Sequence, residues 1–336
     1  MLSETRTPAA APGDVAGTGE TAGQPRSVRL RQQAARYIPF LALILLLVGF
    51  GIVESERFLT VRNAQIILLQ SAVLIIVGLG MTFVIIAGSI DLSVGSLVAV
   101  AAMLSAAAAN QWGLAGALAV ALLVGAAAGL VNGLVFTVLR VPSFIATLGM
   151  LSVARGFTII YSGGAPIPIQ DAGQVLNLGT WPAPVFVAAL AVVVCQVIYR
   201  LTPFGRYVQG IGGNERVALL SGVPVDRTKT LIFVLSGLMA GLGGLVTAAR
   251  LGAGTPQAGT GFELDVISAV VIGGTPLTGG IGNMYSTAVG ALVISTLSNG
   301  LVILGVPSEV QTVIKGIVLV LAVFISLDRR KIGIIK

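Results

Sequence analysis

Long apolar runs, almost free of charge, make up most of this 336-residue chain and limit the structures that it can adopt. Only 10% of the residues are charged and 55% are hydrophobic, whereas a soluble domain carries about 25% charged residues. A chain of this kind cannot cover its apolar side chains with a charged surface. The sequence therefore predicts an all-α polytopic membrane protein.

Ten of the apolar runs are candidates for membrane spans. A bilayer core of about 30 Å is crossed by about 20 helical residues, and shorter runs suffice where neighbouring protein buries their ends. The eighth candidate is the weakest, because glycines and Pro276 interrupt it, and it need not cross completely. The ten runs are Tyr37–Val53, Ala64–Ala87, Leu92–Ala109, Leu114–Leu139, Val141–Tyr161, Pro182–Tyr199, Thr230–Ala249, Phe262–Thr275, Met284–Val306 and Val310–Leu327.

The basic residues orient these spans, because lysine and arginine are retained on the cytoplasmic side of a membrane. With ten crossings, the outer segments hold only Arg57, Arg62 and Arg250, and most other cations fall inside. Both termini are therefore predicted to be cytoplasmic. We interpret the net charge of +7 as this orientation signal and not as a nucleic-acid surface.

The charge pattern also divides the chain. Residues 1–36 are rich in Ala, Gly, Pro and Thr and are predicted to be a disordered cytoplasmic tail. Residues 37–330 form the predicted transmembrane domain, which includes a cytoplasmic loop at 200–229. Residues 331–336 are a short basic cytoplasmic tail.

A weak internal repeat relates the two halves of the domain. Asn132-Gly133-Leu134-Val135 is followed by Val141-Pro142-Ser143, and Asn299-Gly300-Leu301-Val302 is followed by Val306-Pro307-Ser308. The first set lies in spans two to five and the second in spans seven to ten, so that the direction of travel reverses. This order of features favours an inverted-topology repeat, whose halves often line a transport path. A chance match between glycine-rich apolar segments is the alternative.

Several kinds of chemistry are excluded by the residues that the chain lacks. It has no histidine and its one cysteine is Cys195, so it cannot build a Cys/His zinc site, a disulfide within the chain or a Ser-His-Asp triad. It also has no G-x-x-x-x-G-K-[ST] motif for ATP phosphates. We therefore expect no catalytic residue, no metal and no cofactor in this chain.

Asp91 is the most conspicuous charge, because long apolar runs flank it on both sides. A charge at the centre of a bilayer costs about 2.5–3.5 kcal/mol on insertion scales. The carboxylate either caps the following helix, accepting from the amides of Ser93 and Val94, or lines a path, and the two roles are compatible. A catalytic pair with Asp265 is disfavoured by the surrounding sequence.

Two cations, Arg155 and Lys315, interrupt the fifth and tenth spans. Each is expected to extend along its aliphatic stem to a membrane interface, with Glu309 near Lys315 on the outer side. The alternative is that one or both contact a polar substrate or pair with an acid across the repeat interface.

The loop at 200–229 contains one predicted short helix, GNERVALLSGVP at Gly213–Pro224. Asn214 can cap it, Glu215 suits its positive N-terminal end, Gly222 can adopt the left-handed turn, and Pro224 prevents continuation. Val217, Ala218 and Leu220 give it an apolar side. A helix of two turns is short for binding lipid headgroups, so we favour a groove on a partner protein.

Four segments carry a resemblance to a known family. They are AGSIDLSVGSLVAVAAM (Ala87 to Met103), NGLVFTVLRVPSFIATLGMLSVARG (Asn132 to Gly156), TPFGRYVQGIGGNERVALLSGVPV (Thr202 to Val225) and AVVIGGTPLTGGIGN (Ala269 to Asn283). In this order, within residues 37–330, they resemble the permease subunits of bacterial ABC sugar importers of the ribose and xylose type. Branched-chain amino acid permeases are similar, and the sugar assignment depends mainly on IDLSVGS at Ile90 to Ser96.

The resemblance implies an importer that carries a monosaccharide across the inner membrane by alternating access. Its implied partners are a cytoplasmic ATPase subunit that binds ATP-Mg, a periplasmic sugar-binding protein and a second permease copy, which we expect to form a homodimer. It also implies that the short helix is the coupling helix. The residues assigned to that ATPase contact are Asn214, Glu215, Arg216, Ala218, Leu220, Ser221 and Gly222.

A pathway for a polar solute needs hydrogen-bonding groups at membrane depth, and the chain has few of them. The candidates are Asp91, Ser93, Asn132, Thr147 and Asn299. The alternatives to a sugar permease are a branched-chain amino acid permease and a stand-alone ion-coupled carrier. The second should place acids in the middle of its spans, whereas Asp91 and Asp265 lie near span ends.

Overall fold

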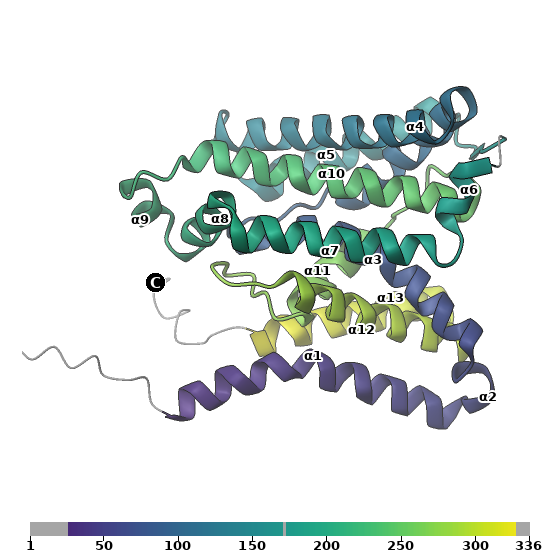
Figure 1. Cartoon of the computed structure of the whole chain (residues 1–336), viewed down its shortest axis with the longest axis horizontal. Helices are drawn as coiled ribbons and strands as arrows, with labels where there is room; N and C mark the ends of the chain where they lie inside the picture. Colours follow the sequence, from purple (N-terminus) through teal and green to yellow (C-terminus); the bar gives the residue numbers. More distant parts are fainter. Residues whose placement is uncertain (1–25, 171–172, 327–336) are drawn as a thin grey trace, which may run out of the picture. The chain divides into compact units, whose positions relative to one another are not determined.

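The computed structural model describes residues 26–170 and 173–326, and it describes side chains for 37–170 and 173–324. This part of the chain is almost entirely helical (Figure 1), as the sequence predicts. Its helices are α1 (Arg26–Val53), α2 (Ser55–Phe58), α3 (Val61–Ile86), α4 (Val94–Thr137), α5 (Ser143–Ser162), α6 (Gly173–Gly179), α7 (Ala183–Leu201), α8 (Pro203–Gly213), α9 (Glu215–Leu220), α10 (Val225–Leu251), α11 (Phe262–Ile272), α12 (Met284–Ile303) and α13 (Ser308–Ser326). Its strands are β1 (Ile167–Pro168) and β2 (Ala253–Gly254).

The predicted number of ten crossings is not confirmed. Within the described residues, six helices are long and apolar enough to cross a membrane, namely α3, α4, α5, α7, α10 and α12, and Tyr37–Val53 is a shorter apolar helix. The predicted spans Leu92–Ala109 and Leu114–Leu139 are joined in α4, whose 44 residues are interrupted by non-helical backbone at Gly113. The eighth predicted span is represented by α11, which has only 11 residues because Gly273 and Gly274 end it.

The tail predictions fall mainly outside the described residues, which begin at Arg26 and end at Ser326. Residues 1–25 and 331–336 are not described, and α1 already begins at Arg26, inside the stretch assigned to the disordered tail. The described chain divides after Arg36, and its second unit begins at Tyr37.

Helix α3 lies at the centre of the second unit. Of its 18 most apolar consecutive residues, 89% are buried. It packs against α10, α12 and α7, with Ile76, Leu79 and Phe83 fully buried. By contrast, only 17% of the most apolar 18-residue stretch of α5 is buried. A helix that is apolar all round is suited either to a protein core or to lipid. The environment of α3 is therefore protein, and the exposed apolar side of α5 is suited to lipid.

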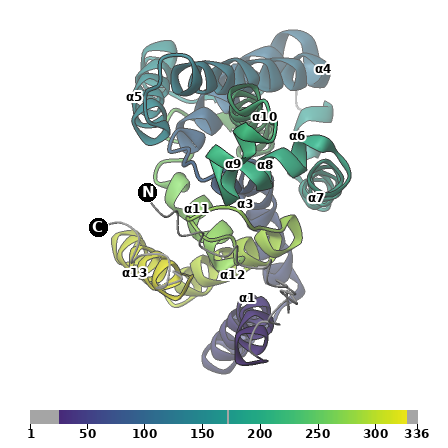
Figure 2. The same ribbon diagram turned by 90° about the vertical axis from the view of Figure 1, so that its left-hand side faces the viewer.

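The most extensive helix pair is α10 with α4, which lie side by side in both views (Figures 1 and 2). Glycines allow this approach, because a Cβ at Gly237 would collide with the carbonyl oxygen of Gly125, and one at Gly125 with that of Gly237. Close approach of helices through small residues is common in membranes. At this pair the glycines therefore serve close packing of the two helices.

Helices from the two halves of the chain pack against each other. Helix α10 of the second half packs on α4 of the first, and α3 of the first half packs on α12 of the second. Strands β1 and β2 pair antiparallel, with Ile167 opposite Gly254 and Pro168 opposite Ala253, so the segment after α5 is tied to the segment after α10.

Candidate functional site

The break between α3 and α4 is stabilised by Asp91. Gly88 has a φ of 74° and ends α3, a left-handed conformation that favours glycine. Asp91 Oδ1 then accepts from the Ser93 amide at 3.0 Å and from the Ser93 hydroxyl at 2.6 Å. The predicted bond from the Ser93 amide is confirmed, whereas the Val94 amide does not donate to this carboxylate within the described chain.

Asp91 also joins two distant parts of the sequence. Its second oxygen, Oδ2, accepts from the Ser236 hydroxyl of α10 at 2.9 Å. The side-chain Nδ2 of Asn132 in α4 donates to the Ser93 hydroxyl oxygen at 2.9 Å. Asp91, Ser93 and Ser236 are fully buried, and Asn132 is 2% exposed. These four side chains form what we call the Asp91 network.

Thr147 lies next to this network, and Asn299 does not belong to it. The Thr147 hydroxyl oxygen accepts from the Leu92 amide at 3.1 Å, which holds α5 against the break. Asn299 lies on α12, and its buried Oδ1 has no hydrogen-bond partner in the described part of the chain. The structure therefore gathers four of the five predicted path residues around one buried turn.

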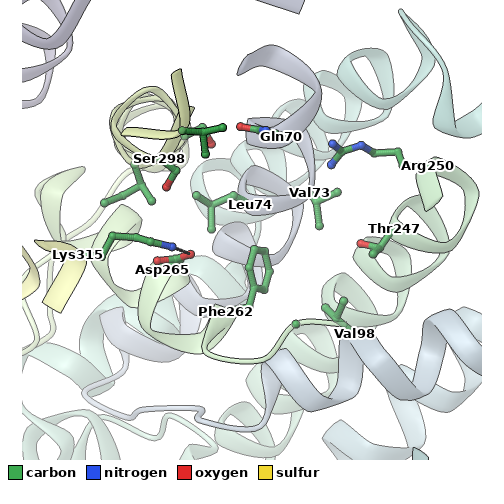
Figure 3. A pocket seen from close by; sticks show the side chains of 14 residues that line it. Gln70, Val73, Leu74, Val98, Thr247, Arg250, Phe262, Asp265, Ser298 and Lys315 are labelled. Atoms are coloured by element: carbon green, nitrogen blue, oxygen red, sulfur yellow. Dashed lines mark hydrogen bonds and ion pairs between the residues drawn. The ribbon is translucent and has the colours of Figure 1, made fainter. Parts of the chain in front are cut away.

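A cavity of about 310 Å³ lies elsewhere, between α3, α4, α10, α11, α12 and α13 (Figure 3). None of the five predicted path residues lines it. Its lining residues are Gln70, Val73, Leu74, Val98, Thr247, Arg250, Gly259, Phe262, Asp265, Ile294, Ser295, Ser298, Val302 and Lys315.

The cavity lining combines apolar walls with polar groups that have no partner. Gln70, Ser295, Ser298 and Arg250 make no side-chain hydrogen bond or ion pair within the described residues; Ser295 is buried, Gln70 and Ser298 are half-buried, and Arg250 is exposed. Figure 3 shows the Arg250 side chain pointing from α10 toward α3, the helix that carries Gln70. An amide, two hydroxyls and a guanidinium supply both donors and acceptors, and such a set suits a small polar solute.

Asp265 and Lys315 form an ion pair in the cavity wall, with 2.8 Å between Nζ and Oδ2. Lys315 thus pairs with an acid, as the alternative prediction has it, but the acid lies in its own half of the chain and not across the repeat interface. Glu309 accepts instead from the Ser308 hydroxyl at 3.1 Å. Asp265 is thus occupied by a cation and Asp91 by hydroxyl donors. Within the described residues, no group of three or more acids and cysteines could hold a metal ion.

Arg155 is bound by backbone carbonyl oxygens of the segment after α10. Its Nη1 donates to the carbonyl oxygens of Pro256 at 2.7 Å and Ala258 at 3.0 Å. This contact fixes the segment between α10 and α11, which contributes Gly259 to the cavity. Arg155 therefore helps to position one part of the cavity wall without lining the cavity itself.

Sequence reasoning missed the uncharged part of this lining. Gln70, Ser295 and Ser298 all lie within long apolar helices, and polar residues at such positions were the available signal. That signal is ambiguous, because many serines in spans bond to their own helix, as Ser105 does to the Ala102 carbonyl oxygen. Only the packing of α3, α10 and α12 distinguishes the two kinds of serine.

The predicted cytoplasmic helix is present as α9. Asn214 caps it by accepting from the Val217 amide at 3.1 Å, and Gly222 has the expected left-handed φ of 81°. Its apolar side chains are divided, since Ala218 is buried while Val217 and Leu220 are 57% and 81% exposed. Glu215 forms an ion pair with Lys229 of α10 at 2.7 Å. Helix α9 thus offers an exposed apolar surface and a fixed inner face.

Comparison with known proteins decides the family. A family model described as "Branched-chain amino acid transport system / permease component" matches residues 63–323. The chain belongs to this permease family.

The permease is 41% identical over 296 residues to the ribose import permease protein RbsC of Escherichia coli K12, covering 85% of this chain and 92% of that protein. It is 43% identical over 302 residues to RbsC of Bacillus subtilis, covering 87% and 92%. It is 32% identical over 364 aligned positions to the xylose transport system permease protein XylH of Haemophilus influenzae, covering 88% and 96%. No solved structure matches the permease significantly.

Proposed function

We propose that this chain is the membrane-spanning permease subunit of an ATP-driven importer and that it carries a monosaccharide across the inner membrane by alternating access. The observation that carries this proposal is similarity over more than four-fifths of the chain to permeases named for ribose and xylose. As a permease subunit, it transports and does not catalyse a reaction of its own. ATP-Mg would bind to a separate ATPase subunit.

The cavity is the candidate stretch of the sugar path. A sugar presents hydroxyl groups that both donate and accept, and Gln70, Ser298 and Arg250 offer matching groups without internal partners. Apolar lining such as Phe262 and Val73 suits the CH faces of a sugar ring. A path must release its solute, so a few hydrogen bonds are preferable to a tight site. Asp91, Ser93, Asn132 and Thr147 would then form a structural hinge region beside the path.

The proposed topology has ten crossings in two inverted halves, spans two to five and seven to ten, with both termini cytoplasmic. Supporting it, α4 consists of two helical segments joined at the non-helical Gly113, and because Asn132 bonds to Ser93 the second segment runs back alongside the first, as two successive crossings would. The packing of α3 on α12 and of α10 on α4, each between the two halves, also fits an inverted repeat. In this arrangement Arg250 and the cavity lie toward the outside.

The proposed partners are an ATPase subunit, a periplasmic sugar-binding protein and a second copy of the permease. The ATPase would bind the surface formed by Asn214–Gly222, where Val217, Leu219 and Leu220 are all more than half exposed. Two turns of helix with exposed apolar side chains fit a groove on a partner protein.

Association with the ATPase can be tested with Leu220→Asp, which places a charge on the exposed surface of α9. Leu59→Asp is the matched control, because Leu59 is 66% exposed on the proposed outer side. We expect Leu220→Asp to abolish co-purification of the candidate ATPase and Leu59→Asp to leave it intact. Retention of the ATPase by Leu220→Asp would reject the proposed contact.

The substrate can be tested by uptake of labelled pentoses and hexoses in a strain that lacks this gene, before and after the gene is returned, with labelled leucine and valine as the comparison. We expect restored uptake of at least one pentose or a hexose and no change for the amino acids. Restored amino acid uptake would support the branched-chain alternative. Uphill uptake by the purified chain alone, driven by an ion gradient, would support a stand-alone carrier.

A further inference from the structure

A single helix, α10, connects the proposed ATPase contact to the cavity. Lys229 near its start is bonded to Glu215 of α9, and Thr247 and Arg250 near its end line the cavity. Lys229 and Arg250 are 21 positions apart, which corresponds to about 32 Å along a helix. Figure 2 shows α9 beside the start of α10. Displacement of one end of α10 can therefore be transmitted along the helix to the other end.

Lys229 holds three elements together at that start. Its Nζ lies 2.7 Å from Glu215 Oε1 of α9 and 4.7 Å from the centroid of the Phe136 ring of α4. Its side chain is only 11% exposed, whereas that of Glu215 is 54% exposed. A buried ammonium group needs compensation, and here one carboxylate and one aromatic face provide it. The link between α9 and the spans is therefore a specific charge contact.

The helices that Lys229 joins behave as one body. Phe136 contacts Phe233 edge to face, with ring centroids 5.8 Å apart, and the hydroxyls of Thr137 and Thr230 are 3.0 Å apart. Further along, the glycines at 125 and 237 bring the two backbones together. Closely packed interiors deform little and transmit displacement. A force applied to Lys229 therefore moves α4 and α10 together.

The neighbouring ion pair is a weaker candidate for the same task. Arg140 and Asp226 are bidentate at 2.9 and 3.0 Å, but their side chains are 71% and 52% exposed. Exposed pairs contribute little and are screened by salt. This pair also joins α10 to the segment after α4 and does not contact α9.

We propose that Lys229 is the positioning residue through which movement of α9 reaches the α4–α10 pair and the cavity wall. The proposal rests on the proposed function, because it takes α9 to be the ATPase contact. Lys229 touches neither ATP nor sugar. Its task is to convert displacement of α9, by way of Glu215, into displacement of α10.

The test uses the permease reconstituted in liposomes with its ATPase and binding protein. Lys229→Met keeps the aliphatic stem and removes the charge, and it leaves Glu215 hydrated. Arg227→Met is the matched control, because Arg227 is an exposed cation of the same turn with no partner in the described chain. Lys229→Arg keeps the charge and serves as the rescue variant. Three quantities are measured: ATPase bound per permease, ATP hydrolysed and sugar taken up.

For Lys229→Met we expect normal ATPase binding and a fall in sugar taken up per ATP of about fivefold or more, the lower end of usual coupling between sites. Arg227→Met and Lys229→Arg should stay within about twofold of wild type on the same scale. Unchanged uptake per ATP in Lys229→Met would overturn the proposal and leave α8 as the route of transmission. Loss of ATPase binding in Lys229→Met would also overturn it, since Lys229 would then belong to the docking surface. Loss of ATPase binding in Leu220→Asp is a separate result that bears on the docking assignment itself.

Discussion

The hydroxyl of Ser236 donates to Oδ2 of Asp91 across 145 positions of sequence, at 2.9 Å, in a site closed to solvent. The bond joins the middle of α10 to the break between α3 and α4. It places a fully buried carboxylate among hydroxyl and amide donors instead of a cation. Hydrogen bonds to charged groups contribute about 1.5–3 kcal/mol each, so this contact is a substantial tie between the two halves of the chain.

Removal of that donor should destabilise the protein. Ser236→Ala leaves Asp91 with one buried oxygen unsatisfied, and we expect a loss of about 1.5–3 kcal/mol in the free energy of unfolding. The measurement is denaturant or thermal unfolding of the purified protein in detergent. Ser268→Ala is the matched control, because Ser268 is 2% exposed but its hydroxyl only donates to the Leu264 carbonyl of its own helix. Equal losses in the two variants would contradict the assigned role of Ser236.

The Asp265–Lys315 pair should behave as a coupled unit. Lys315→Met leaves Asp265 unpaired in a site where its side chain is 20% exposed, and because the pair is only partly buried we expect a loss of about 1–3 kcal/mol, between the values for exposed and buried pairs. Adding Asp265→Asn removes the unpaired charge and should recover most of that loss. A double-mutant cycle on unfolding free energies measures the coupling. Additive losses would mean that the pair contributes nothing by its contact.

Solvent should reach the cavity from the outside. Ser298→Cys is expected to react with a membrane-impermeant maleimide added to intact spheroplasts, because Ser298 lines the cavity. Cys195 is 1% exposed and should stay unlabelled, which provides an internal control. Ser268→Cys is the matched buried position. Failure of Ser298→Cys to react, or labelling only after the membrane is opened, would contradict the proposed orientation.

Local features were predictable because their causes lie within a few residues. The cap of α9 depends on Asn214 and the Val217 amide, and its end depends on Gly222. The Asp91 turn likewise depends on the Ser93 amide two residues away. Such bonds follow from residue type and spacing, and the structure confirms each of them.

Partners distant in sequence were not predictable in the same way. Lys315 was expected near Glu309, six positions away, and it pairs with Asp265, fifty positions away. The backbone partners of Arg155 were not predicted: it binds carbonyl oxygens of a segment about a hundred positions further on. Each of these partners is brought near by helix packing, which the apolar pattern of a span does not specify.

That this is a helical membrane permease follows from its residues alone, because scarcity of charge and long apolar runs allow no other environment and because the ordered motifs identify the family. Which polar side chains share the Asp91 turn and which face the cavity depends on how the helices pack. A lipid-exposed helix and a protein-buried helix have the same apolar composition, so the sequence pattern does not distinguish them. Where the helices cross, and so where Gln70, Arg250 and Ser298 meet, depends on close glycine contacts such as Gly125 with Gly237.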